Sequence, residues 1–281
     1  MTINCKGNLV SLDMPLVMGI INVNTDSFYA DSRHSSIDEV LFTAEKMLLD
    51  GAAILDIGGQ STRPGNIAHT EEEELMAVVP VVESISKRFP DAIISIDTYR
   101  SKVAEYACQS GAAIINDISG GSFDNDMFAV AASNKAVYIL MHLNGDIHTM
   151  HQPAAYNNIL GDITDYFIHK TAQCRQAGIH DIILDIGIGF SKTIAENYFL
   201  LKHLDHFSMF DMPLLIGLSR KSFIYKSLNT NPENALNGTT ALNFLSLTKG
   251  ANILRVHDVK EAVELVKMYN YYASTGNNIE L

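Results

Sequence analysis

Cysteine is scarce in this chain of 281 residues, which has only Cys5, Cys108 and Cys174. An odd number of cysteines at such wide spacing provides neither a disulfide framework nor the close pairs of a zinc site, so a reducing compartment, the cytoplasm, is expected. Residues 1–10 lack the continuous apolar stretch of a secretory signal, and no apolar run approaches the roughly 18 residues of a membrane span. The sequence therefore predicts no association with a membrane.

Positive charge is also in short supply. Twenty Lys and Arg residues stand against 32 Asp and Glu residues, which gives a formal net charge of −12. Such a surface repels polyanions, so general nucleic-acid binding is not expected, and an anionic substrate would need a local cluster of cations. Disorder is excluded because 47% of the residues are hydrophobic and only 19% are charged.

Two common catalytic motifs are missing. Gly-x-Ser-x-Gly, the nucleophile motif of many hydrolases, does not occur. The first apolar run is followed by Asn22-Val23-Asn24-Thr25 and not by the Gly-x-Gly-x-x-Gly of a dinucleotide site; the nearest approach, Gly187-Ile188-Gly189, is too short to be specific. A serine hydrolase and a dinucleotide-binding enzyme are both disfavoured.

Short apolar runs rich in Ile, Val and Leu recur along the chain, and their lack of polar alternation is typical of buried parallel strands. They cover residues 17–23, 54–59, 93–98, 113–119, 137–142, 182–187, 214–219 and 253–258. Segments with helical spacing lie between them, among them residues 37–49, 71–88, 102–108 and 159–177. Eight strands alternating with helices predict an α/β fold, a (β/α)8 TIM barrel that forms a single domain over residues 1–281. The alternative is an open Rossmann-like sheet with a small second domain, but such sheets usually stop at five or six strands.

Polar residues end nearly every one of these runs. Because barrel enzymes place their chemistry at the carboxyl ends of the strands, such residues are candidates for function. Each one by itself could equally be a turn cap or a satisfied buried polar group. The set comprises Asn22, Asp56, Asp97, Asn116, His142, Asp185, Ser219, Arg220, Lys221, Arg255 and His257.

Cations gather at the carboxyl ends of the last two runs. Arg220 and Lys221 lie where a helix should begin, and Arg255 and His257 lie in the next run. The loops after strands seven and eight form the usual phosphate pocket of barrel enzymes, and Arg63 could close the cluster from the loop after strand two. We interpret these residues as a phosphate or pyrophosphate site; the alternative is a solvated basic turn.

Carboxylates and an amide end three other strands. Asp97, Asn116 and Asp185 should point into the barrel, where buried carboxylates are costly unless donors pair with them. A ligand with several N–H groups along one flat edge, such as an aminopyrimidinone ring, would satisfy them. Alternatively, Asp97 and Asp185 bond to neighbouring backbone and to Lys221. A metal site built from His and carboxylate ligands is disfavoured because no such pair has helical spacing.

Seven segments in order resemble the dihydropteroate synthase family over nearly the whole chain. They are MGIINV at 18–23, DIGGQSTRPG at 56–65, SIDT at 95–98, INDISGG at 115–121, DIGIGF at 185–190, SRKSF at 219–223 and RVHDV at 255–259. The second segment is almost diagnostic by itself. The resemblance implies a homodimeric (β/α)8 enzyme, a transferase that joins 6-hydroxymethyl-7,8-dihydropterin pyrophosphate to p-aminobenzoate with loss of pyrophosphate, that uses Mg²⁺, and that is a sulfonamide target in folate biosynthesis.

The resemblance also implies roles for individual residues, with Asp97, Lys221, Arg255 and His257 as the catalytic set. The pterin ring would be held by Asp97, Asn116, Asp185 and Lys221 in a slot lined by Met141, Phe190 and Gly217. Asn22 would bind the Mg²⁺ that travels with pyrophosphate, and Arg63, Arg255 and His257 would bind its oxygens. Thr62, Pro64, Phe28 and Ser222 would form the p-aminobenzoate pocket. The implied mechanism is a dissociative substitution through a pterin-stabilised cation.

The first loop departs from the family pattern. Thr25 stands where the family usually has Pro, and the second Asp is displaced by one position to Asp31. Because Pro fixes φ and the missing Gly pair admits positive φ, the conformation of residues 24–33 should differ from the usual one. The roles of Asp31 and Phe28 are therefore open, and so is that of the additional cation Arg33.

Two rival functions fit part of the pattern. A corrinoid-dependent, pterin-binding methyltransferase shares the barrel and the Asp and Asn residues that bind the pterin, but it does not need a pyrophosphate site. The basic segments 219–223 and 255–259 therefore favour the synthase. A catalytically silent pterin-binding protein is favoured only by the altered first loop. The apolar segment 241–247 is a candidate dimer surface, or it packs on the barrel.

Overall fold

Eight parallel strands close into a barrel in this computed structural model, which describes residues 1–23, 33–59 and 69–275. The strands follow one another around the barrel in the order β10-β3-β4-β5-β6-β7-β8-β9. The predicted (β/α)8 barrel is therefore confirmed, and the open sheet is excluded. The strands are β3 (Leu16–Asn22), β4 (Ile54–Gly58), β5 (Ile93–Asp97), β6 (Ile114–Asp117), β7 (Val137–Met141), β8 (Ile182–Asp185), β9 (Leu214–Ile216) and β10 (Ile253–Val256).

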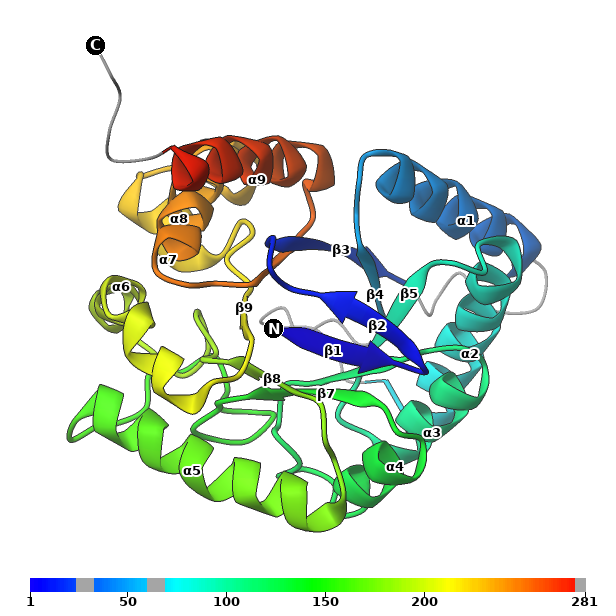
Figure 1. Ribbon diagram of the computed structural model, residues 1–281. Helices are drawn as coiled ribbons and strands as arrows, with labels where there is room; N and C mark the ends of the chain where they lie inside the picture. The colour runs from blue at the N-terminus through cyan, green and yellow to red at the C-terminus, as the bar shows by residue number, and fades with distance from the viewer. Residues whose placement is uncertain (24–32, 60–68, 276–281) are drawn as a thin grey trace.

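Helices surround the strands as an outer layer (Figure 1). Those predicted at 71–88 and 159–177 have the predicted bounds, and those predicted at 37–49 and 102–108 are longer. Threonine begins two of the helices with a capping box, Thr70 with Glu73 and Thr193 with Glu196, in which side chain and backbone satisfy each other's donors. The helices are α1 (Arg33–Leu49), α2 (Glu71–Arg88), α3 (Ser101–Gln109), α4 (Met127–Ser133), α5 (Ile159–Ala177), α6 (Ile194–Lys202), α7 (Ser222–Ser227), α8 (Leu236–Thr248) and α9 (Val259–Ser274), with short 3₁₀ helices η2 (Leu204–Phe210) and η3 (Pro232–Asn234).

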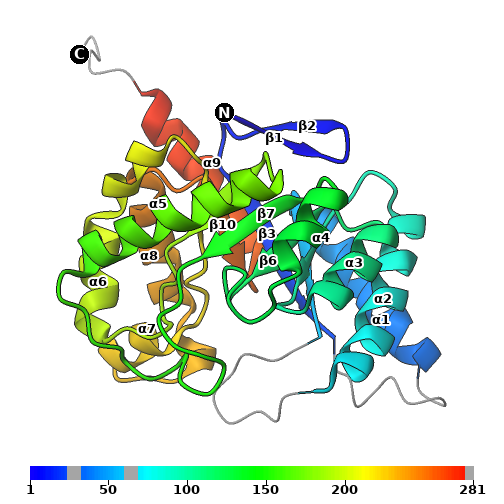
Figure 2. The ribbon, with the colours of Figure 1, turned by 90° about the horizontal axis from the view of Figure 1, so that it is seen from below.

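A hairpin at the N-terminus, β1 (Thr2–Cys5) and β2 (Asn8–Ser11), was not among the predicted elements. Its turn residues Lys6 and Gly7 both have positive φ, 52° and 90°, as a type I′ turn requires. Its buried side chains pack with the apolar side chains inside the barrel, including Met18 and Ile54. The hairpin thereby covers the amino end of the barrel, at the top of Figure 2, and leaves the carboxyl end for a site.

Strand register brings the predicted polar residues to one level. Asp97 lies opposite both Gly58 on β4 and Asn116 on β6, and Met141 lies opposite Asp185. All of these are at the carboxyl ends of their strands, where the sequence predicted a site. No helix within the described ranges is long and apolar enough to cross a membrane.

Candidate functional site

Arg255 joins two carboxylates at the carboxyl end of the barrel. Its Nε donates to Asp56 Oδ2 at 2.6 Å, and its Nη2 donates to Asp97 Oδ2. The same oxygen of Asp56 accepts from Asn116 Nδ2 at 3.1 Å. Asp56 is fully buried, whereas 15% of the Asp97 side chain is exposed. One guanidinium thus connects β10, β4 and β5, and Asp56 orients both Arg255 and Asn116.

The carboxyl group of Asp97 has a raised pKa. Burial raises the pKa of its carboxyl well above the ordinary value, and the nearby carboxylates of Asp56, Glu74 and Asp117 add to the rise. Arg255 opposes it, but does not cancel it. A raised pKa means that the ionised form of Asp97 is under-stabilised in the protein alone, so a ligand that donates hydrogen bonds to it would stabilise that form and lower the pKa.

Lys221 and Asp185 lie on the opposite side of the site from β5. Lys221 Nζ donates to the carbonyl oxygen of Ile188 and lies 4.3 Å from the centroid of the Phe190 ring. Burial lowers the pKa of Lys221 to about 8, although the Asp185 charge opposes that shift. Asp185 Oδ1 accepts a hydrogen bond from the Gly187 backbone N–H at 2.8 Å. The alternative prediction, that Asp185 bonds to neighbouring backbone, is therefore correct in part. Burial nevertheless raises the pKa of Asp185.

An apolar wall completes this end of the barrel. Phe190 and Met141, both predicted to line a ring slot, pack with Ile118 and Met150 in one buried cluster. Neither Ile118 nor Met150 was predicted; Met150 lies in a loop without any pattern that could have identified it. A planar ligand held by Asp97 and Lys221 would have apolar side chains beside its faces.

Other predicted residues within the described ranges lie around the rim. His257 Nδ1 is 2.9 Å from Ser219 Oγ, which also accepts from the His257 backbone N–H at 3.2 Å. Gly217 lies beside Arg255: a Cβ placed on it would be 3.9 Å from Arg255 Cβ. Asn22, at the end of β3, and Ser222, the first residue of α7, are exposed. Thr62, Arg63, Pro64, Phe28 and Asp31 lie outside the described residues.

Arg220 has a different surrounding from the other cations. Its Nε and Nη2 donate to the two oxygens of Asp258 at 2.9 and 2.8 Å, and its Nη1 donates to the carbonyls of Pro232 and Glu233. The anion beside Arg220 is therefore Asp258, and not the phosphate that the sequence predicted for this group of cations. Arg220 fastens the loops after β9 and β10 together, with a positive φ of 55°, and is not directed to a substrate.

A resident metal site is not formed by the described side chains. No group of three or more His, Cys, Asp or Glu residues among them is arranged to hold an ion. Asn22 offers one amide oxygen, exposed, at the rim. A single oxygen ligand suits Mg²⁺ that brings its other ligands as waters and substrate phosphates. The residues present fit an ion that arrives with an anionic substrate.

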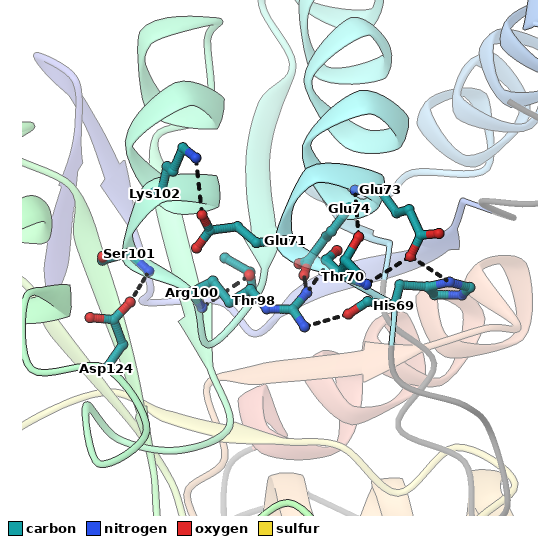
Figure 3. Close-up of polar contacts among 10 residues, drawn as sticks. All are labelled: His69, Thr70, Glu71, Glu73, Glu74, Thr98, Arg100, Ser101, Lys102 and Asp124. Atoms are coloured by element: carbon teal, nitrogen blue, oxygen red, sulfur yellow. Dashed lines mark hydrogen bonds and ion pairs between the residues drawn. The ribbon is translucent and has the colours of Figure 1, made fainter. Parts of the chain in front are cut away.

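Beside the site, Arg100 locks the start of α2 to the loop after β5 (Figure 3). Its guanidinium donates to Glu74, which is fully buried, and to the backbone carbonyls of His69 and Thr70. Burial raises the pKa of Glu74 more than Arg100 and Thr98 lower it. This ion pair was not predicted, because Glu74 looks like one of four consecutive exposed acids in the first turn of a helix.

We expect Arg100→Met to lower the free energy of unfolding by about 3–5 kcal/mol at pH 8, because it removes one partner of a buried pair. In the variant the folded-state pKa of Glu74 rises further above its unfolded value, so stability decreases as pH rises through that interval. Urea denaturation at pH 5 and pH 8 should therefore give a smaller loss at pH 5. Thr70→Ala, which removes a cap at the same helix end, is the control at about 1 kcal/mol. Equal losses at both pH values would contradict the role given to Glu74.

Comparisons with known proteins agree with one another. A family model described as "Pterin binding enzyme" matches residues 18–257. The dihydropteroate synthase of Escherichia coli K12 is 41% identical over 280 residues, 99% of each chain. A crystal structure of the Yersinia pestis dihydropteroate synthase with a sulfonamide drug complex superposes with a TM-score of 0.90 at 39% identity, covering 98% of this chain and 99% of that one. The Xanthomonas albilineans dihydropteroate synthase with 4-aminobenzoic acid gives 0.89 at 32% identity, with coverages of 98% and 99%.

Proposed function

Because the chain belongs to the pterin-binding enzymes, and among them to the dihydropteroate synthases, we propose that it condenses 6-hydroxymethyl-7,8-dihydropterin pyrophosphate with p-aminobenzoate. The products are 7,8-dihydropteroate and pyrophosphate, a step of folate biosynthesis. The identity of 41% with the Escherichia coli enzyme over 99% of both chains carries the proposal. It is a transferase reaction: a C–N bond forms at the carbon that loses the pyrophosphate oxygen.

The pterin ring is assigned to Asp97, Asn116, Asp185 and Lys221. The N–H edge of an aminopyrimidinone needs acceptors, and ionised carboxylates offer only acceptors. Burial raises the pKa of both Asp97 and Asp185, and ring donors would stabilise their ionised forms. Lys221 supplies the donor for the ring's acceptors. The slot beside the ring faces is assigned to Met141, Phe190 and Gly217.

The leaving pyrophosphate is assigned to Arg63, Arg255 and His257. Arg255 has two roles in this proposal: it binds the pyrophosphate, and its Nε and Nη2 hold Asp56 and Asp97. It would stabilise the leaving group while keeping the carboxylate of Asp97 in place. Asn22 would hold Mg²⁺, which when bound supplies charge neutralisation to the pyrophosphate oxygens. Mg²⁺ is proposed as the cofactor of the reaction on this basis.

The proposed mechanism is dissociative. The C–O bond breaks first, its electron pair leaves with pyrophosphate, and a cation remains on the pterin methylene carbon. The ionised Asp97 stabilises this cation, and the amine of p-aminobenzoate then forms the C–N bond and releases a proton to water. Such a reaction needs fixed charges more than a strong base. The p-aminobenzoate pocket is assigned to Thr62, Pro64, Phe28 and Ser222, of which only Ser222 is described.

The deciding experiment supplies the protein with the pterin pyrophosphate, p-aminobenzoate and Mg²⁺ and follows dihydropteroate by mass spectrometry. Formation of product supports the synthase. Tight pterin binding without product would instead favour the catalytically silent protein. Omitting Mg²⁺ or adding a chelator should suppress the product, and unchanged turnover without the ion would contradict its assignment.

The pH dependence of kcat/KM should be bell-shaped. Activity requires ionised Asp97, so it rises as that carboxyl loses its proton, at a pH above the ordinary aspartate range near 4. It also requires protonated Lys221, so it decreases above the pKa of about 8. Initial rates from pH 5 to 10 measure both limbs. Lys221→Arg should move the alkaline limb upward, and an unmoved limb would show that another group is responsible.

We also propose that the enzyme is a cytoplasmic homodimer. All three cysteines are unpaired and buried, which suits a reducing compartment. On α8 and α9, four large side chains are exposed by 55–79%: Leu245, Met268, Tyr271 and Tyr272. The segment 241–247 was predicted either to form the dimer surface or to pack on the barrel. It has residues of both kinds, since Leu247 is buried on the barrel and Leu245 is exposed. A second copy of the chain would cover this patch.

Light scattering after gel filtration tests the dimer. The wild type should elute at about twice the chain mass of 30.9 kDa, and the double variant Leu245→Glu, Tyr271→Glu should be a monomer because a dimer would bury both charges. Leu9→Glu, at an exposed position on the N-terminal hairpin, is the control. A variant that remains dimeric would place the interface on another surface.

A further inference from the structure

The loop between β8 and α6 has an uncommon backbone. Gly187, Gly189 and Ser191 have positive φ values of 67°, 84° and 46°. A Cβ on Gly187 would lie 2.1 Å from the carbonyl oxygen of His142, so only glycine fits there. Ser191 has no such freedom, and a backbone of this kind persists only where its surroundings determine it. The loop therefore depends on groups outside itself.

The backbone of Ser191 is held by Met150 and Ala154, and Lys192 holds the rest of the loop. Its Nζ donates to the carbonyls of Gly187 at 2.9 Å and Phe190 at 3.1 Å, and lies 3.2 Å from His142 Nδ1. An ammonium has three N–H donors, so all three have acceptors. Because the ammonium only donates, Nδ1 of His142 accepts and the ring proton is on Nε2. Burial and the Lys192 charge keep the pKa of His142 well below its usual range, so the ring is neutral.

Stability alone does not account for a lysine at this position. Lys192 is only 8% exposed, and no carboxylate in the described part of the chain lies within ion-pair distance of it. Burial lowers its pKa to about 7, with Asp185 as the largest opposing charge. An ammonium without a counter-ion is costly to bury, and because the three acceptors around Lys192 are neutral they offset that cost only in part.

The loop held by Lys192 contacts two residues of the pterin site, Asp185 and Lys221, and contains a third, Phe190. Gly187 N–H donates to Asp185, the Ile188 carbonyl accepts from Lys221, and the Phe190 ring lies under the Lys221 ammonium. A Cβ on Gly189 would lie 2.6 Å from Lys221 Cδ, so the loop also packs closely against that side chain. Displacing the loop would therefore displace Lys221 and Phe190 together.

We propose that Lys192 is a positioning residue for the pterin half of the site, holding loop 187–191 so that Phe190 and Lys221 meet the ring. It touches no reacting atom itself. The inference rests on the proposed function for the identity of the ring. It predicts a selective defect: the pterin subsite loses affinity, whereas the p-aminobenzoate subsite, assigned to other loops, does not.

The test compares Lys192→Met with the wild type and with Lys202→Met, an exposed lysine on α6. We expect Lys192→Met to raise the calorimetric Kd for 6-hydroxymethyl-7,8-dihydropterin and the KM for its pyrophosphate at least about tenfold, one decade of affinity. The KM for p-aminobenzoate should stay within about twofold of the wild type, and Lys202→Met should change neither constant. A lower Tm with unchanged pterin Kd, or equal increases in both KM values, would overturn the proposal.

Lys192→Gln decides the question if the Met variant does not fold. Its amide keeps polar character but cannot reach all three acceptors, so the pterin Kd should still rise at least about threefold; an unchanged Kd overturns the proposal. Failure of the proposed function would look different. The wild type would then form no dihydropteroate, while the effect of Lys192 on pterin binding would be measured independently by calorimetry.

Discussion

Arg255→Met should reduce kcat/KM for dihydropteroate formation by about 10³-fold and lower the free energy of unfolding by about 3–5 kcal/mol. Both effects have one cause. The guanidinium pairs with both Asp56, which is fully buried, and Asp97, and without it two carboxylates remain close together with no cation between them. One of them then takes up a proton, and Asp97 can no longer serve as a fixed negative charge. Steady-state kinetics and urea denaturation measure the two effects.

Arg255→Lys separates charge from geometry. Lysine keeps the positive charge but cannot present two N–H groups in a fixed fork to Asp56 and Asp97. We expect it to recover much of the stability and little of the activity. Near-normal activity in the lysine variant would mean that a point charge is enough at this position. The proposal that Arg255 both binds pyrophosphate and holds Asp97 in place would then be wrong.

Asp97→Asn should lower kcat by about 10²–10³-fold, the usual effect of removing one electrostatic stabiliser of a transition state. The amide keeps the shape of the side chain but not the charge that stabilises the developing pterin cation. The free energy of unfolding should change by less than about 1.5 kcal/mol, because the lost ion pair is offset by removal of a carboxylate that is costly to bury. Lys221→Ala should behave similarly, lowering turnover far more than stability.

Asp181→Asn is the matched control. This carboxylate precedes β8 at the amino end of the barrel, where it accepts from the backbone of Asn4 in the hairpin. The substitution should leave kcat unchanged, because the carboxyl end alone is assigned the chemistry. Near-normal synthase activity in either Asp97→Asn or Lys221→Ala would refute the site assignment. A loss of activity in Asp181→Asn would contradict the assignment of the chemistry to the carboxyl end of the barrel.

Much of the fold could be predicted from local patterns. Seven of the eight barrel strands lie within the predicted apolar runs, and β3 begins one residue before its run, at Leu16. The agreement arises because a strand buried on both faces must be apolar over its whole length. The N-terminal hairpin was missed although Lys6-Gly7 is a plausible turn, since four-residue strands carry too few residues for a clear period. Its place at the amino end depends on the shape of the barrel interior, which no local pattern encodes.

The candidate site was predicted as a set of residues but not as a set of contacts. Asp97, Asn116, Asp185, Lys221 and Arg255 do lie at one end of the barrel, as strand-end positions required. Lys192 was not singled out, because a lone lysine before a helix has no distinguishing pattern in one sequence. Arg220 and Arg255 looked alike as cations of neighbouring loops, yet one is paired with Asp258 and the other with Asp56 and Asp97.

By itself, the sequence determined the barrel, the end at which polar residues collect and the family, because periodicity and motifs are local properties of the chain. Only the tertiary structure decided which charges meet. Arg255 bonds to residues 199 and 158 positions away, and those pairs exist because closure of the barrel brings β10 within reach of β4 and β5. Side-chain partners follow from register and closure, which are properties of the whole fold.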